Sequence, residues 1–319
     1  MTMTTVGELH TSNRADMWNA SMQSHLPYLD TATGLFKEEF TRDRPCPVCG
    51  GANETALFVK EGGRYVRCTD CTMVYLNPVF TDEALTDYYR NNHVEQSVVV
   101  EADRAFYEGL YTQGLASAEK YTSKGWILDI GCSSGVFIDL AKSRGWKTSG
   151  LELNRQEAAL ARAKGHTVQE RPIAEATFDK KFNVISLWDV FEHIADGGAQ
   201  LDLMQANLTD DGVMLLQIPS ADSLAARMLQ EKCNMFDGLE HTNLYGVASL
   251  ARLVESKGLE ILNIESVISE IGVMNNHLAY DGLYTGASDN FETLMDLVDA
   301  RTVLDKLLGY KLQVVIGRK

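Results

Sequence analysis

The chain has 319 residues, of which 45% are hydrophobic and 23% are charged, a balance typical of a globular protein with a sizeable core. At this length we expect roughly two domains of about 150 residues each. Its 29 basic and 44 acidic residues give a net charge of −15, which argues against a broad basic surface for nucleic acid or other polyanions.

No stretch of the sequence has the pattern of a targeting or membrane-spanning segment. Residues 1–40 carry charges throughout, and nowhere do roughly 18 apolar residues follow one another. We therefore expect a cytoplasmic protein with no membrane partner. Thiols stay reduced in that compartment, so its cysteines are expected to bind a metal or to be buried rather than to form disulfides.

Four of the six cysteines form two close pairs, Cys46 with Cys49 and Cys68 with Cys71. The C-x2-C-x18-C-x2-C pattern lets two tight turns present four thiolates to one ion, which predicts structural Zn2+. Between the pairs, residues 55–60 and 64–68 are expected to be strands joined by a Gly-Gly turn. Two disulfides, or four unconnected buried thiols, are the alternatives. We expect an N-terminal extension at 1–40 and a zinc ribbon at 41–80.

After a helical linker at 81–122, short apolar runs alternate with amphipathic stretches. This alternation predicts right-handed β-α-β units, hence an α/β fold with a mostly parallel, Rossmann-like sheet and helices on both faces. The expected strands are 126–131, 147–153, 166–170, 182–191 and 213–219, and the expected helices are 135–145, 155–165 and 199–212.

The first of these strands ends at Asp129 and a loop of small residues. A nicotinamide dinucleotide fingerprint would need glycine where this chain has Ser133 and Val136, and a carboxylate beside a pyrophosphate would repel it. S-adenosylmethionine fits better, because it has no phosphate and carries an ammonium and a sulfonium. Asp129 can attract the ammonium, and Glu152, after the second strand, can accept hydrogen bonds from both ribose hydroxyls. The alternative is that both are ordinary strand-end carboxylates.

The segments ILDIGCSSG, GLELN, FNVISLWDVFEHI, LTDDGVMLLQIPS and LEHTNLYGVASLARLVESKGLEI resemble class I S-adenosylmethionine-dependent methyltransferases. The resemblance covers roughly 123–270 and the final strand, and it implies a methyltransferase domain at 123–319. Within that superfamily the chain is similar to bacterial enzymes that carry an N-terminal zinc ribbon. Several of those methylate carbon or oxygen of sugars, nucleotide sugars or related metabolites.

The resemblance also implies which residues contact the cofactor. Glu170 and residues 173–175 are expected near the adenine. Ser133 stands where the family commonly has glycine, and it keeps a small side chain there. The implied cofactor-binding residues are Asp129, Gly131, Cys132, Ser133, Gly135, Glu152, Leu153, Leu187, Trp188 and Asp189.

Methyl transfer is an in-line displacement, and an oxygen or carbon acceptor also needs a base. Histidine suits that role near neutral pH, and two Glu-His pairs follow predicted strands, Glu192-His193 and Glu240-His241. Sugar C-methyltransferases of this type carry a His-Glu-His-x-x-x-Tyr-like segment at the second pair. Here the leading histidine is Leu239, so O-methylation stays open beside C-methylation.

We expect four catalytic residues, each with a structural alternative. His241 can instead cap the helix expected at 247–258, His193 can brace the cofactor pocket, and Tyr245 can serve packing. The expected catalytic residues are His241, Glu240, His193 and Tyr245.

Residues 270–309 form an insertion between two expected strands at 260–269 and 311–317. Such a segment can be a substrate-side lid, a helical packing arm or a homodimer contact, and the sequence does not choose among them.

The sequence thus predicts an enzyme that transfers a methyl group from S-adenosylmethionine to a small polar acceptor, such as a sugar, nucleotide sugar or glycan precursor. One alternative is an RNA or protein methyltransferase whose ribbon selects the macromolecule, although the acidic charge argues against RNA. Another is a non-catalytic S-adenosylmethionine-binding protein, against which the two Glu-His pairs argue.

Overall fold

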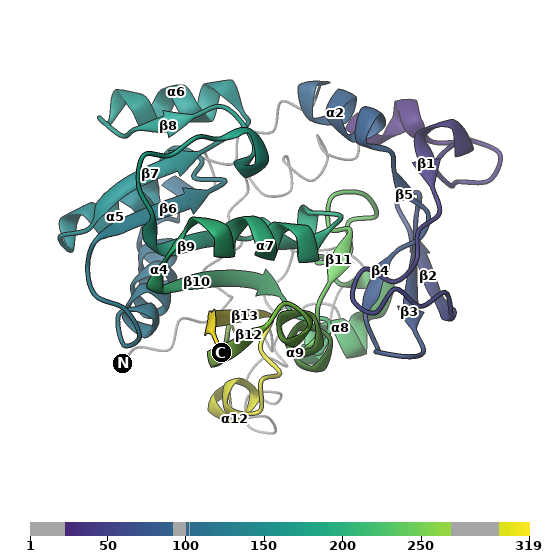
Figure 1. Ribbon diagram of the computed structural model, residues 1–319. Helices are drawn as coiled ribbons and strands as arrows, with labels where there is room; N and C mark the ends of the chain where they lie inside the picture. The colour runs from purple at the N-terminus through teal and green to yellow at the C-terminus, as the bar shows by residue number, and fades with distance from the viewer. Residues whose placement is uncertain (1–22, 92–99, 102, 269–299) are drawn as a thin grey trace, which may run out of the picture. The chain divides into compact units, whose positions relative to one another are not determined.

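The computed structural model describes residues 23–91, 100–101, 103–268 and 300–319 (Figure 1). Most of the predicted insertion at 270–309 lies outside these residues. Within them, no helix is both long enough and apolar enough to cross a bilayer. The chain divides into two compact units: the first comprises Met1–Val94, Pro219–Leu250 and Ser266–Lys311, and the second comprises Glu95–Ile218, Ala251–Glu265 and Leu312–Lys319.

A seven-stranded sheet organises the second unit. Its strand order is β12-β13-β10-β9-β6-β7-β8, and the neighbours from β10 to β8 pair in parallel. The mostly parallel α/β fold predicted from the sequence is therefore confirmed. The strands are β6 (Trp126–Ile130), β7 (Lys147–Leu151), β8 (Val168–Gln169), β9 (Phe182–Trp188), β10 (Leu208–Pro219), β12 (Leu259–Val267) and β13 (Lys311–Arg318).

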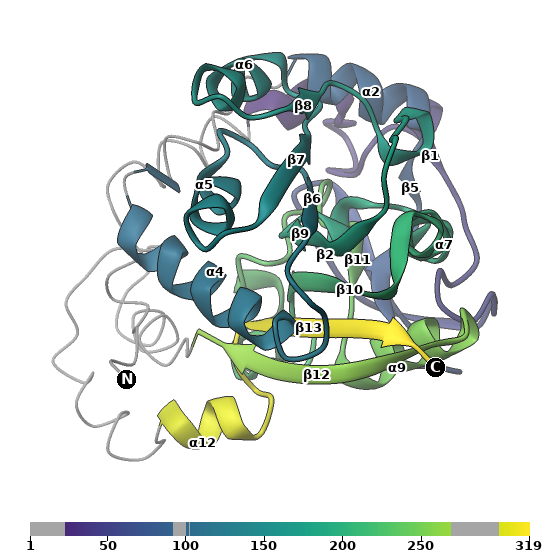
Figure 2. The same cartoon turned by 60° about the vertical axis from the view of Figure 1, so that its left-hand side comes forward.

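Helices cover both faces of this sheet. Figure 2 shows α4 and α5 on one side of the strands and α7 on the other. Tyr111 of α4, Phe137 of α5 and Trp188 of β9 meet edge to face or tilted, with ring centroids 4.7 to 5.5 Å apart. These helices are α4 (Arg104–Ala118), α5 (Val136–Ser143), α6 (Arg155–Ala163), α7 (Gly197–Asn207) and α9 (Val247–Ser256).

One predicted boundary is wrong. The helix expected at 199–212 ends at Asn207, and β10 begins at Leu208, earlier than the expected 213. Leu208 already pairs with Phe182 of β9, and the register shifts before Val213. The polar residues Thr209, Asp210 and Asp211 lie in this irregular stretch and are half-buried or exposed, so the strand can depart from its regular register there.

A four-stranded sheet, in the order β11-β4-β3-β2, organises the first unit. The predicted hairpin of 55–60 and 64–68 is confirmed, since β2 and β3 pair antiparallel. The short strand β11, from far along the chain, completes the sheet by pairing with β4. The strands are β2 (Glu54–Lys60), β3 (Gly63–Cys68), β4 (Val74–Leu76) and β11 (Asn243–Leu244); separately, β1 (Thr41–Arg42) pairs with β5 (Val79–Phe80).

Two apolar clusters stabilise the first unit. In one, Phe80 and Tyr88 pack with Tyr28 and Leu239; in the other, Tyr65 and Phe236 pack with residues of α8 and α12. The helices are α2 (Asp82–Asn91), α8 (Leu224–Leu229) and α12 (Ala300–Asp305), and short 3-10 turns lie at Leu26–Tyr28, Glu38–Phe40, Ile173–Glu175, Phe191–His193 and Gln230–Lys232.

Candidate functional site

The order of the parallel strands reverses at β6. From this strand the chain first adds β7 and β8 on one side, and then returns to add β9 and β10 on the other. Ligands of doubly wound sheets bind outside the carboxyl ends of the strands at such a switch point. The predicted cofactor-binding residues end or follow β6, β7 and β9, so the sheet brings them to one edge of the second unit.

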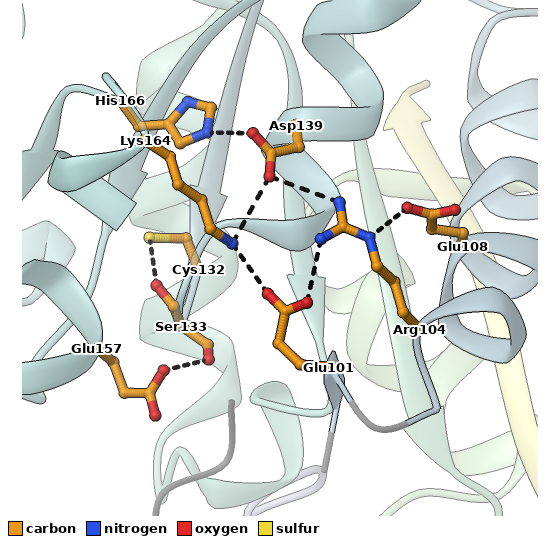
Figure 3. Close-up of polar contacts among 9 residues, drawn as sticks. All are labelled: Glu101, Arg104, Glu108, Cys132, Ser133, Asp139, Glu157, Lys164 and His166. Carbon is orange, nitrogen blue, oxygen red and sulfur yellow. Dashed lines mark hydrogen bonds and ion pairs between the residues drawn. The ribbon is translucent and has the colours of Figure 1, made fainter. Parts of the chain in front are cut away.

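The loop after β6 has a backbone that favours small residues. Gly131 and Gly135 have φ angles of 73° and 88°, in the left-handed region, and a Cβ at Gly131 would lie 2.6 Å from the Val190 side chain. Ser133 also has a positive φ, of 45°. Its strain is compensated locally, because its hydroxyl donates to Glu157 Oε2 at 2.7 Å (Figure 3).

Glu152 links the two strand ends. Its Oε2 accepts a hydrogen bond from the Ser133 amide and its Oε1 accepts one from the Asn154 amide, both at 2.8 Å. Burial raises its pKa, and these backbone donors oppose that rise. Beside it, the Leu153 side chain is 65% exposed, which is unusual for leucine. A carboxylate and an exposed apolar side chain therefore lie together at the end of β7.

Asp129 is buried at the end of β6, with 2% exposure. Its Oδ1 accepts a hydrogen bond from the Ser186 hydroxyl at 2.7 Å. Burial, with a smaller contribution from the negative charge of Glu152, raises the pKa of Asp129 to about 8, and the Ser186 hydrogen bond opposes this rise. A cation placed against this carboxyl would favour its ionised form.

The end of β9 is also held by polar contacts. Asp189 has a φ of 56°, and its Oδ2 accepts a hydrogen bond from Gln217 Nε2 at 3.0 Å. Leu187 is fully buried and Trp188 is 8% exposed, so both also contribute to the core. Cys132 packs against β7, where a Cβ on Gly150 would lie 2.5 Å from its sulfur.

An ionic cluster surrounds the helices that follow this loop. Asp139 of α5 accepts from the His166 ring at 2.8 Å, and its other oxygen lies 3.7 Å from both Lys164 and Arg104 (Figure 3). Glu101 also pairs with Lys164 and Arg104. The cluster ties α4, α5 and the end of α6 together within the second unit. No motif in the sequence indicated it.

The two predicted Glu-His pairs lie in different units. Glu192, which is 1% exposed, and His193 form a 3-10 turn after β9 in the second unit. Glu240 and His241 precede β11 in the first unit. Tyr245 follows β11 and is fully buried.

His241 is held in a defined orientation. Its Nδ1 lies 2.6 Å from the Met235 carbonyl oxygen and 3.7 Å from Asp237 Oδ2. The Asp237 carboxylate also accepts the His241 amide at 3.0 Å. A proton on Nδ1 satisfies the carbonyl, and in that neutral tautomer Nε2 carries no proton.

Glu240 is a half-buried acid next to this histidine in the sequence. Tyr88 of α2 donates a hydrogen bond to its Oε1 at 2.6 Å. Burial raises the pKa of Glu240 to about 7, and Asp237 contributes to the rise while the Tyr88 bond opposes it. Tyr88 and Asp237 were not predicted from the sequence.

The four clustered cysteines meet in the first unit. One sulfur from each lies within 4.8 Å of the others, and Cys46 and Cys71 approach to 3.4 Å while Cys49 and Cys68 approach to 3.5 Å. All four are free thiols. Tetrahedral zinc with bonds of about 2.3 Å needs sulfurs about 3.8 Å apart, so this cluster fits the ion.

Comparison with known proteins identifies a family for this chain. A family model described as a methyltransferase domain matches residues 104–264. Similar solved structures include an S-adenosylmethionine-dependent methyltransferase from Archaeoglobus fulgidus, 19% identical, with a TM-score of 0.48 over 66% of this chain and 94% of that chain. Another is an S-adenosylmethionine-dependent methyltransferase from Clostridium acetobutylicum, 12% identical, with a TM-score of 0.46 over 70% of this chain and 96% of that one. No curated protein matches the chain.

The family match runs from the first residue of α4 into β12 and includes β6, the loop after it, and both Glu-His pairs. It spans half of the chain. The protein therefore belongs to the methyltransferase-domain family.

Proposed function

We propose that the enzyme methylates a small polar metabolite, such as a sugar, nucleotide sugar or glycan precursor, with the donor held at the carboxyl ends of β6, β7 and β9. The observation that carries this proposal is the buried Asp129 carboxyl beside Glu152 at the switch point. That pair suits a nucleoside with a positively charged amino acid part, because a nearby cation favours the ionised carboxylates, whereas a diphosphate would disfavour them. The net charge of −15 favours a small acceptor over RNA.

Unsatisfied polar atoms around this loop support a polar ligand. Within the described part of the chain, the buried Ser134 hydroxyl and Trp188 Nε1 have no hydrogen-bond partner. Buried polar groups without partners are costly, so a ligand or water that meets them stabilises the site. Ser134 was not among the predicted cofactor residues, since a serine beside the loop glycines carries no distinctive signal.

The donor, when bound, supplies a methyl group activated by the sulfonium. Asp129 would orient the ammonium, Glu152 would accept the ribose hydroxyls, and the exposed Leu153 would cover the adenine. His241 Nε2 would remove the acceptor proton, with Glu240 beside it. The protein thus aligns the acceptor and moves one proton.

Replacing Glu152 with alanine is expected to weaken S-adenosylmethionine binding roughly 5- to 150-fold, because two ribose hydroxyls lose a charged acceptor. Calorimetric titration measures the change. Glu255→Ala, at an exposed position of α9, serves as the matched control and is expected to bind like the wild type. Equal affinity in Glu152→Ala and Glu255→Ala would remove Glu152 from the ribose site.

Binding of S-adenosylmethionine at pH 7 is expected to release up to about one proton per site. The pKa of Asp129 is raised to about 8, so its carboxyl is mostly protonated before the ammonium arrives, and the ammonium stabilises its ionised form. Calorimetry in buffers of different ionisation enthalpy measures the release. Asp129→Asn, which keeps the shape, is expected to bind more weakly and release no proton from this position. Wild-type binding without release would contradict the ion pair.

We also propose that the four cysteines hold one structural Zn2+. Burial raises the pKa of the Cys46 thiol to about 11, so a buried thiolate there needs a cation. We expect about one zinc per chain by elemental analysis, and loss of most of it in Cys49→Ser. Cys233→Ser, a buried cysteine of the same unit outside the cluster, is the control and is expected to keep its zinc. A fully folded, metal-free wild type would overturn the proposal.

Labelled donor offered to separate pools of nucleotide sugars, other metabolites, RNA and protein tests the acceptor class. We expect label in a small-molecule pool, and label in RNA or protein would favour a macromolecular acceptor. No label in any pool would favour the non-catalytic alternative.

With the labelled acceptor in hand, His241→Asn is expected to lower turnover by roughly two orders of magnitude or more, because the general base is lost while donor binding is unchanged. His166→Asn provides the histidine control, since the His166 ring pairs with Asp139 within the second unit. Full turnover in His241→Asn would exclude it as the base.

A further inference from the structure

We propose that Tyr65 is a positioning residue for His241, and that the cysteine-bearing sheet is the scaffold of the turn from Gly238 to His241. The proposal rests on the role proposed for His241. In this proposal the four-stranded sheet positions the base rather than recognising a macromolecule. All the residues involved belong to the first unit.

The Tyr65 hydroxyl closes both ends of this turn. Tyr65 lies on β3, between the two cysteine pairs, and is fully buried. Its hydroxyl accepts a hydrogen bond from the Gly238 amide at 3.2 Å and donates one to the His241 carbonyl oxygen at 3.2 Å. One side chain therefore satisfies the first amide and the last carbonyl of the four-residue turn.

The Tyr65 hydroxyl is expected to stay protonated, and so to keep both hydrogen bonds, near neutral pH. Burial raises the pKa of Tyr65 well above its ordinary value, and the charge of Asp237 adds to the rise. The hydroxyl therefore keeps the proton that it donates to the His241 carbonyl.

The hairpin tip and the turn also touch backbone to backbone. A Cβ on Gly63 would overlap the Gly238 carbonyl, and a Cβ on Gly238 would overlap the Lys60 carbonyl. Gly238 has a φ of 80°, which favours glycine for a second reason. The first amide of the turn is therefore placed directly against the end of the β2–β3 hairpin.

The residues after His241 are held by the same sheet. Arg44, two residues before Cys46, donates from Nη2 to the Thr242 carbonyl at 2.8 Å and to Asn243 Oδ1 at 3.0 Å. The Leu76 amide also donates to the Thr242 carbonyl at 3.0 Å. Both flanks of His241 are thus bonded to segments that adjoin the cysteines.

In our proposal, the hydrogen bonds to the turn determine which ring nitrogen of His241 carries the proton. The Nδ1 contact with the Met235 carbonyl requires the ring and the turn to keep their present geometry. Without the Tyr65 hydroxyl, the Gly238 amide and the His241 carbonyl both lose a buried partner, and the turn must move to find others. The ring then loses the hydrogen bond that keeps the proton on Nδ1.

Tyr65→Phe in the full-length, zinc-loaded protein tests the proposal without needing the acceptor. Labelling the seven histidines with 15N, and assigning His241 from the His241→Asn spectrum, reports which ring nitrogen carries the proton. We expect the Nδ1-protonated form to lose its dominance, and amides 238–242 to exchange roughly tenfold faster. Zinc content and S-adenosylmethionine affinity are expected to stay as in the wild type.

Tyr75→Phe is the matched control. Tyr75 lies on β4 of the same sheet and is fully buried, but its hydroxyl donates to Glu54 at 3.0 Å. We expect this variant to keep the wild-type His241 spectrum and exchange rates. Unchanged His241 signals in Tyr65→Phe, or equal changes in both variants, would overturn the proposal.

Gly63→Ala provides a second route if Tyr65→Phe does not fold. Its φ is ordinary, so alanine is compatible with the hairpin, whereas the added Cβ displaces Gly238. We expect the same change at His241, and an unchanged His241 spectrum would count against the proposal. If the wild type failed to bind the donor, the proposed function would fall, while the tautomer measurement would still decide whether Tyr65 positions His241.

Discussion

The proposed donor site depends on one costly arrangement, a carboxyl group buried where the order of the parallel strands reverses. Among the described residues the Ser186 hydroxyl donates a hydrogen bond to Asp129, and Glu152 adds a like charge nearby. The Ser186 hydrogen bond does not offset the cost of burying the charged carboxylate, so the pKa of Asp129 is about 8. A cation that binds beside Asp129 would stabilise the ionised carboxylate. The positive φ angles of Gly131, Ser133 and Gly135 then let the loop backbone approach a ligand closely.

Local patterns were sufficient to predict much of this. The β6 strand, its loop of small residues and Glu152 are encoded within a short stretch of sequence, and the paired spacing of the cysteines indicated that they would meet. The helix expected at 199–212 forms but ends at Asn207, earlier than expected, for a local reason. A polar run after a helix can continue the helix or begin an irregular strand. Here Leu208 pairs with β9, so the run belongs to the strand.

The surroundings of the proposed base could not be predicted in this way. Tyr88 reaches Glu240 across 152 positions of sequence, and Tyr65 reaches His241 across 176. Neither tyrosine lies in a motif, and a buried tyrosine in a strand or amphipathic helix is ordinarily packing. Only the tertiary structure shows that their hydroxyls are committed to the turn that carries the Glu-His pair.

Contacts within the first unit connect the proposed zinc site to the turn that carries the proposed base, although the zinc itself would take no part in the reaction. Strands β3 and β4 connect the cysteines to the His241 turn through Tyr65, Leu76 and backbone pairing, and Arg44 joins the same turn from beside Cys46. The proposed ion, by ordering the two C-x2-C turns, would therefore also order the turn of the proposed base, because metal binding is coupled to the folding of this small sheet. The Asp129 carboxyl lies in the other unit, with its own core. If both proposals hold, loss of the metal should lower the rate of methyl transfer, because the base is disordered. Donor affinity, which would depend on the second unit, should change less.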